Sequence, residues 1–156
     1  MPATIRHPSP SMMPALRYRD APAAIAWLCR VLSFEKHLVV PGETAGTVAH
    51  AQLTLGRGMI MLGSDTDDSR QGEYGRLIRR PDELGGYNTQ SIYVLVADID
   101  GHHARAVQEG AEILMDLKPQ DYGGKLYTCR DPEGHVWNFG SYDPWAPPAE
   151  GVQEVG

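Results

Sequence analysis

The pattern of hydrophobic and polar positions predicts two copies of one arrangement, a strand followed by a helix and three more strands. In the first half, apolar residues predict strands over 11–19, 34–40, 47–55 and 59–62, with a helix over 23–32. In the second half the same order returns, with strands predicted over 90–96, 113–116, 125–130 and 136–139 and a helix over 99–109. The chain is therefore expected to contain two βαβββ modules.

Two aspartates mark the repeat. Asp20 and Asp98 lie 78 positions apart, and each follows an apolar strand and precedes a helical pattern. We interpret both as helix N-caps, because an aspartate oxygen at that position accepts a hydrogen bond from an unpaired backbone N–H. A repeat of this length indicates that the working site lies on the surface that the two copies build between them.

The ends and the middle of the chain lack a periodic pattern. Residues 1–11 contain three prolines and predict a flexible arm, and the polar, glycine-rich stretch 65–89 predicts a connecting loop that acts as a lid or a connector. The remainder forms one predicted domain over 12–145, with module one at 12–64 and module two at 90–141, followed by a tail at 146–156. We expect Trp145 to pack this end of the chain across the surface.

Composition narrows the functional classes. The chain has 156 residues, 42% of them hydrophobic, which suits one globular domain. A net charge of −6 argues against a nucleic-acid surface, and we interpret the local cluster Arg76, Arg79 and Arg80 as a solvated charged turn. No apolar stretch is long enough to cross a membrane and no export signal precedes the domain, so a cytoplasmic protein is expected. Cys29 and Cys129 predict two buried thiols.

One segment carries a family resemblance. Residues 131–139, with the sequence DPEGHVWNF, together with the in-register repeat, resemble the vicinal oxygen chelate superfamily, which includes glyoxalase I, bleomycin-resistance proteins, fosfomycin-resistance transferases and extradiol dioxygenases. The resemblance covers residues 12–145. It implies an α+β fold in which two βαβββ modules form a curved, cup-like mixed sheet with the helices outside.

The resemblance also implies four positions at which enzymes of the superfamily hold a divalent metal ion. Here those positions carry Met13, Met61, Ser91 and Asn138, or Gly63 in place of Met61 in a shifted alignment. Thioethers, a hydroxyl and a neutral amide bind Zn²⁺, Fe²⁺ or Mn²⁺ poorly. We therefore expect no metal and no cofactor, and a divergent member of the bleomycin-resistance type.

Strand alternation predicts which side chains line the cup. A lining of methionines, tyrosines and a few polar groups suits an aromatic or mixed-polarity organic molecule. Tyr122 and Tyr127 are expected near a glycine-containing loop that closes the mouth. The predicted lining comprises Met13, Arg17, His50, Gln52, Met59, Met61, Ser91, Tyr93 and Asn138.

Several polar side chains leave two interpretations open. His50 either hydrogen-bonds a ligand or moves a proton, or it is satisfied by a neighbouring strand or by water. Arg17 either binds a carboxylate or phosphate or lies in solvent. His102 and His103 are expected near the exposed side of their helix, and His135 is expected to be structural.

Three functions are compatible with these features. The first is a metal-independent protein that sequesters a small organic molecule. The second is a lyase, isomerase or dioxygenase of the same superfamily whose metal site has drifted or whose chemistry uses His50 or a tyrosine. The third is an accessory module that only pairs with another protein. The resemblance also implies a homodimer, for which an exposed Trp145 would provide one contact.

Overall fold

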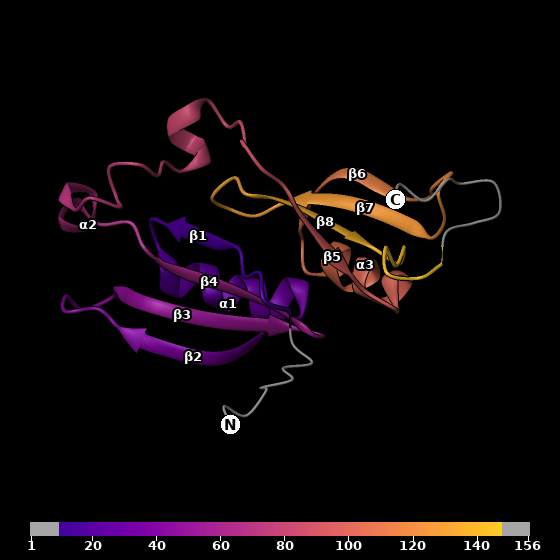
Figure 1. Cartoon of the computed structure of the whole chain (residues 1–156), viewed down its shortest axis with the longest axis horizontal. Helices are drawn as coiled ribbons and strands as arrows, with labels where there is room; N and C mark the ends of the chain where they lie inside the picture. The colour runs from indigo at the N-terminus through magenta and orange to yellow at the C-terminus, as the bar shows by residue number, and fades with distance from the viewer. Residues whose placement is uncertain (1–9, 148–156) are drawn as a thin grey trace, which may run out of the picture.

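The structure, a computed structural model, describes residues 10–147 and contains two similar units side by side (Figure 1). The first unit is a four-stranded sheet with the strand order β1-β4-β3-β2, in which β1 and β4 are parallel and the other pairs antiparallel. Its elements are β1 (Ala15–Tyr18), α1 (Ala21–Leu32), β2 (Glu35–Pro41), β3 (Val48–Leu55) and β4 (Gly58–Ser64).

The second unit repeats this topology in the order β5-β8-β7-β6, again with its first and last strands parallel. Its elements are β5 (Ile92–Leu95), α3 (Ile99–Gln108), β6 (Glu112–Pro119), β7 (Lys125–Arg130) and β8 (Val136–Gly140). The predicted tandem βαβββ fold is therefore confirmed. Strand β6 extends beyond the predicted 113–116, because its pairing with β7 continues to Pro119 through two irregularities.

Both helices have the predicted aspartate as N-cap, although α1 starts at Ala21, two residues before the predicted start at 23. The Asp20 side chain accepts a hydrogen bond from Ala23 N at 3.1 Å, and the Asp98 side chain accepts one from Gly101 N at 3.1 Å. Each aspartate therefore pairs one of the backbone donors that a helix start leaves open. The two caps place both helices at the same point of their modules.

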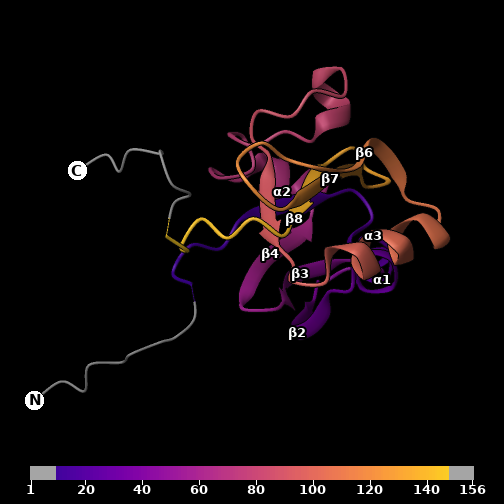
Figure 2. The same cartoon turned by 90° about the vertical axis from the view of Figure 1, so that its right-hand side faces the viewer.

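The hydrophobic core lies between the sheets and the helices, which share one side of the molecule (Figure 2). The largest fully buried side chains include Leu28 and Leu32 of α1, Tyr127 of β7, and Trp137 and Phe139 of β8. Because strand side chains alternate, the residues between these point to the opposite face of each sheet. We call that opposite face, on either sheet, the cup face.

The cup is open in this chain. Over the described residues the hydrogen-bonded strands fall into two separate sheets, so the sheets do not close. Helices α1 and α3 contact each other (Figure 2) and help to join the modules on the helix side. All of β2 is exposed, including Leu38 and Val40. The cup faces therefore remain accessible to solvent.

The connecting segment contains two short helical turns where the sequence predicted only loop. These are α2 (Asp67–Gln71) and the 3-10 turn η1 (Pro81–Leu84). Thr66 caps α2 by accepting from Ser69 N at 3.1 Å, while the Ser69 hydroxyl accepts from Thr66 N at 2.9 Å. This reciprocal cap explains how a polar stretch without an apolar period still forms a helical turn.

The described parts of the chain ends differ from one expectation. Trp145 is 92% exposed, so the prediction that it packs across the surface is wrong. Most of the predicted arm and tail, namely residues 1–9 and 148–156, lie outside the described residues. Among residues 10–147, every helix is too short or too polar to cross a membrane.

Candidate functional site

The cup face of the first sheet brings together five of the predicted lining residues. Strand pairing sets Met61 between Ala15 and Gln52, with Leu38 beyond Gln52. Gln52 Nε2 and His50 Nε2 are 3.1 Å apart. An amide nitrogen can only donate, so His50 accepts at Nε2 in its neutral form. Arg17, His50, Gln52, Met59 and Met61 are all half-buried on this sheet.

The cup face of the second sheet holds the other group. Tyr93 lies beside Asn138, and Asn138 lies beside Thr128. Ser91 immediately precedes β5 and is exposed, whereas Met13 precedes β1 of the first sheet and is also exposed. Among residues 10–147, no side-chain hydrogen bond joins the lining residues of one sheet to those of the other. The structure thus forms two half-sites rather than one closed site.

Three tyrosines at the second sheet contact one another through Tyr142. The Tyr93 hydroxyl donates to the backbone carbonyl of Tyr142 at 2.6 Å, and the Tyr122 ring meets the Tyr142 ring edge-on at 5.0 Å. A Cβ on Gly140 would lie 2.7 Å from the Tyr93 hydroxyl, so only glycine leaves room for this ring. The rings stay partly exposed, with Tyr93 at 39%. Sequence reasoning missed Tyr142, because it follows the last strand.

Asn138 is already engaged within its own sheet. Its side-chain oxygen accepts from the Thr128 hydroxyl at 2.8 Å, and its amide nitrogen donates to the backbone carbonyl of Ile92 at 3.2 Å. Both functional atoms of the amide therefore have partners. This position links β5, β7 and β8 and stiffens the cup face.

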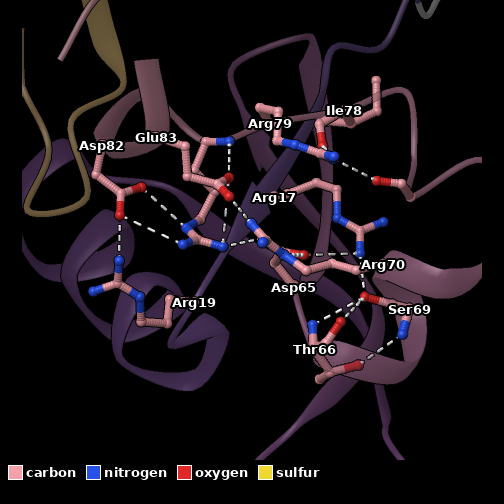
Figure 3. A network of polar contacts seen from close by, with 12 residues as sticks. Arg17, Arg19, Asp65, Thr66, Ser69, Arg70, Ile78, Arg79, Asp82 and Glu83 are labelled. Carbon is pink, nitrogen blue, oxygen red and sulfur yellow. Dashed lines mark hydrogen bonds and ion pairs between the residues drawn. The ribbon is translucent and has the colours of Figure 1, made fainter. Parts of the chain in front are cut away.

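Arg17 is part of an ionic network that ties the connecting segment to the first module (Figure 3). Its guanidinium lies 3.5 Å from Asp65 Oδ1 and also donates to Ser69 Oγ. Asp65 in turn pairs with Arg70 and Arg80. Of the two interpretations for Arg17, solvent exposure is excluded, since its side chain is 17% exposed.

The charged groups of this network shift the pKa of Asp65. Burial alone would raise the pKa of Asp65, but the hydrogen bond from Arg70 and the positive charges of Arg80 and Arg70 outweigh it and lower that pKa. Arg80 is buried rather than solvated, so the interpretation of its cluster as a solvated turn is wrong for this residue. A buried guanidinium is retained here because Asp65, Asp82 and Glu83 surround it.

Tyr127 does not line the cup, and this prediction is wrong. It lies within β7, the strand predicted over 125–130, but its side chain is 0% exposed and its hydroxyl bonds to His102 Nδ1 at 2.6 Å. Burial raises the pKa of Tyr127 far above its ordinary value. His102 is also buried, so the prediction that it lies near the exposed side of its helix is wrong. Its Nε2 donates to the Leu32 carbonyl at 2.9 Å. Strand alternation places Tyr127 with Cys129 on the helix side.

The turn that carries the family resemblance connects the two modules. Asp131 Oδ2 accepts from the Tyr18 hydroxyl at 2.7 Å and from Trp137 Nε1 at 3.1 Å. The Glu133 carboxylate accepts from Arg19 N and Asp20 N, at the end of β1. His135 Nε2 donates to the Arg17 carbonyl at 2.9 Å, as its predicted structural role requires. The motif is therefore a structural anchor between modules.

The four positions implied for a metal do not suit a divalent ion. Met13 and Met61 offer thioethers, Ser91 offers an exposed hydroxyl, and the oxygen of Asn138 already has a donor. In proteins, Zn²⁺ and Fe²⁺ are bound mainly by imidazole, carboxylate or thiolate groups. Within residues 10–147, no group of three or more His, Cys, Asp or Glu side chains is arranged to hold a metal ion.

Comparisons with known proteins agree with this architecture. Residues 9–139 match the family model of the glyoxalase/bleomycin resistance protein/dioxygenase superfamily. The uncharacterized protein Rv0887c of Mycobacterium tuberculosis is 30% identical over 131 residues, which are 84% of this chain and 74% of the relative. The crystal structure of TioX from Micromonospora sp. ML1 is 32% identical, covers 83% of this chain and 95% of its own, and has a TM-score of 0.65.

A more distant structure has the same fold. Lactoylglutathione lyase from Agrobacterium tumefaciens is 21% identical, with 86% of this chain and 94% of that chain covered and a TM-score of 0.58. At this identity the likeness concerns the fold alone.

Proposed function

Because the chain belongs to the glyoxalase/bleomycin resistance protein/dioxygenase superfamily, we propose that it binds a small organic molecule on its cup faces without a metal ion. The observation that carries the proposal is the set of half-exposed side chains on the faces that no described helix covers. Methionines and fixed tyrosines there offer apolar and aromatic contact area, and His50 with Gln52 offers polar contacts.

Rigid aromatic rings favour an aromatic ligand. Because Gly140 and the bond to Tyr142 hold the ring of Tyr93 in place, little side-chain freedom is lost when a planar group stacks on it. Met61 on the other sheet adapts its shape to irregular ligands. These features support a planar or mixed-polarity organic molecule, such as an aromatic or peptide antibiotic.

His50 gives the proposed site a polar contact that can act in either direction. In the observed pairing Nε2 accepts from Gln52, which leaves Nδ1 as the N–H donor. A ligand carbonyl could take that donor, and a ligand donor could displace Gln52. We assign His50 to ligand binding, because hydrogen bonding to a ligand needs no further catalytic group.

A second copy of the chain completes the proposed site. The two half-sites are open in one chain, and the exposed apolar residues beside them, including Leu38, Val40 and Met115, would be covered in a homodimer. Exposed Trp145 is a further contact candidate.

A thermal-shift screen with bleomycin and other aromatic or peptide antibiotics, in the presence of a chelator, tests the proposal. A true ligand at about a hundredfold its Kd adds about 2.7 kcal/mol and raises Tm by several degrees. We expect Tyr93→Ala to abolish this shift. The matched control is Tyr74→Ala, which removes an exposed tyrosine of the connecting segment.

Metal analysis of freshly purified protein provides the opposing test. Stoichiometric Zn, Ni, Mn or Fe bound by cup-face side chains would contradict the proposal and favour the metal-dependent lyase, isomerase or dioxygenase of the same superfamily. A rise in Tm that an antibiotic causes without the chelator but not with it would contradict the proposal in the same way.

A further inference from the structure

A groove at the junction of the two modules forms a second candidate binding site. Two adjoining shallow cavities, both open to solvent and of about 590 Å³ and about 430 Å³, share Gly86, Tyr87 and Arg130. Small-molecule sites have volumes in this range. Apart from Ser91, which borders the smaller cavity, none of the predicted cup residues lines either of them. We call the two cavities together the junction groove.

Three carboxylates that border the groove already accept hydrogen bonds or ion pairs from other groups of the protein. Asp131 Oδ1 accepts from two backbone N–H groups of its own turn, and Oδ2 accepts from Tyr18 and Trp137. Glu133 accepts from the backbone at the end of β1. Asp82 pairs with Arg19 and with the buried Arg80. These carboxylates stabilise the structure around the groove, and few of their oxygen lone pairs remain free to accept hydrogen bonds from a ligand.

Arg130 and Glu112 are different, because this ion pair remains partly exposed to solvent. They are register partners on β7 and β6, and Arg130 Nη1 lies 3.0 Å from Glu112 Oε1. Arg130 Nε has no hydrogen-bond partner among the described residues, but this atom is buried, so a ligand would bind the Nη groups of the guanidinium. The two side chains are 37% and 58% exposed. The groove therefore presents a guanidinium and a carboxylate side by side, each able to make further charge-assisted hydrogen bonds.

Tyr87 adds a flat apolar surface to this pair. It borders both cavities and is 79% exposed. The next residue, Asn88, fixes the backbone, since its Nδ2 donates to the Gly134 carbonyl at 2.9 Å and its Oδ1 accepts from Val136 N at 3.1 Å. The backbone next to Tyr87 is therefore held in place, while the Tyr87 ring faces solvent. A ligand ring that stacks on Tyr87 would cover exposed apolar area.

We propose that the junction groove binds a free α-amino acid with an aromatic side chain. An α-amino acid carries a carboxylate and an ammonium group on one carbon, which matches the adjacent Arg130 and Glu112. The carboxylate binds Arg130, the ammonium group binds Glu112, and the aromatic ring packs on Tyr87. This inference does not depend on the proposed cup ligand, because the two sites use different side chains.

Calorimetric titration of the full chain with L-phenylalanine tests this proposal. Phenylacetate, which lacks the ammonium group, and phenethylamine, which lacks the carboxylate, are the matched comparison compounds. We expect each to bind at least about tenfold more weakly than L-phenylalanine, because each forfeits one charge-assisted contact. Equal affinity for either compound, or no binding of L-phenylalanine at millimolar concentration, would overturn the proposal.

Variants then locate the site. We expect Arg130→Gln and Glu112→Gln each to weaken binding of L-phenylalanine by at least about tenfold, and Tyr87→Ala by about threefold to tenfold. Arg30→Gln and Glu109→Gln, which break an exposed ion pair elsewhere, are the matched controls.

Two further comparisons keep these results interpretable. Far-ultraviolet circular dichroism establishes that each variant is folded, and Glu112→Gln and Tyr87→Ala alter exposed side chains, so they remain informative even if Arg130→Gln is unstable. Tyr93→Ala separates the two sites, since it removes a cup residue and should leave the amino-acid affinity unchanged. Folded groove variants with unaltered affinity, or a loss of affinity in Tyr93→Ala alone, would refute the assignment.

Discussion

Asp131 illustrates how a conspicuous residue can serve the fold rather than a site. Its two oxygens accept four hydrogen bonds, from Tyr18, Trp137, Glu133 N and His135 N, within the core. Burial, followed by the charge of Asp131, raises the pKa of Tyr18, so the phenol stays a donor. A single residue of the turn at 131–134 therefore links module two to module one through side-chain hydrogen bonds.

Replacement of Asp131 by Asn is expected to destabilise the protein. The substitution turns one acceptor oxygen into a donor that faces other donors, and we expect a loss of about 3 kcal/mol in the free energy of unfolding. Urea denaturation followed by circular dichroism measures it. Asp143→Asn, at an exposed turn, is the control and should cost less than about 1 kcal/mol. A change in Asp131→Asn no larger than that of the control would refute the anchoring role.

At the scale of elements, the helices join the modules through a small polar cluster. His102 of α3 donates to the carbonyl at the end of α1 and bonds to Tyr127 of β7, while Arg105 of α3 donates to the Arg30 carbonyl at 2.9 Å. The end of α1 thus receives donors that its own helix cannot supply. The contact depends on a neutral His102, whose pKa burial lowers despite the hydrogen bond to Leu32.

This lowered pKa predicts a pH dependence of stability. The folded protein takes up a proton on His102 less readily than the unfolded chain, whose histidine titrates near 6.5. The contribution is therefore complete above about pH 6.5 and is lost as the pH falls through the lowered folded pKa. Urea unfolding between about pH 7.5 and 5 measures it, above the range in which the carboxylates titrate.

Variants identify the histidine that is responsible. His102→Gln should flatten this part of the pH profile and lower stability at neutral pH by about 1–3 kcal/mol, because the bonds to Leu32 and Tyr127 change. His37→Gln, at an exposed position of β2, should leave the profile unaltered. An unchanged slope in His102→Gln would show that another group causes the dependence.

At the scale of the whole molecule, each sheet is covered by a helix on one side only. Helices cover one side of the sheets, whereas the cup faces and edge strands β2 and β6 carry exposed apolar residues. Isolated apolar residues are normal on a surface, but a face shared by two open sheets favours association. The proposed homodimer belongs to this scale, since no single residue or strand determines it.

Sedimentation velocity tests the homodimer directly. At micromolar concentration we expect a species of about twice 17.1 kDa. Val40→Lys on β2 should shift it toward the monomer, because a buried, unpaired ammonium group is costly in an interface. Val107→Lys, an exposed position on α3 at the helix side, is the matched control. A monomer in the unmodified protein would exclude the homodimer.

The sequence by itself determined the module order, both helix starts and the face of most strands. These features depend on local rules, namely apolar periodicity, turn residues and N-cap chemistry, which act over a few residues. Asp20 and Asp98 cap as predicted, and His50 and Gln52 share the predicted face. The strand over 125–130 is predicted correctly, but the face of Tyr127 is not, because this side chain lies in the core rather than at the mouth of the cup.

Only the tertiary structure decided which of these residues meet. Tyr18 and Asp131 are 113 positions apart, and Arg17 and Ser69 are 52 apart, so no local pattern predicts either contact. The junction groove likewise depends on the placement of the connecting segment. The side chain of Asn88 holds this segment against β8 by accepting a hydrogen bond from Val136 N. Local propensities specify elements, but the relative placement of elements follows from burial and long-range polar contacts, which a single sequence does not encode as a readable pattern.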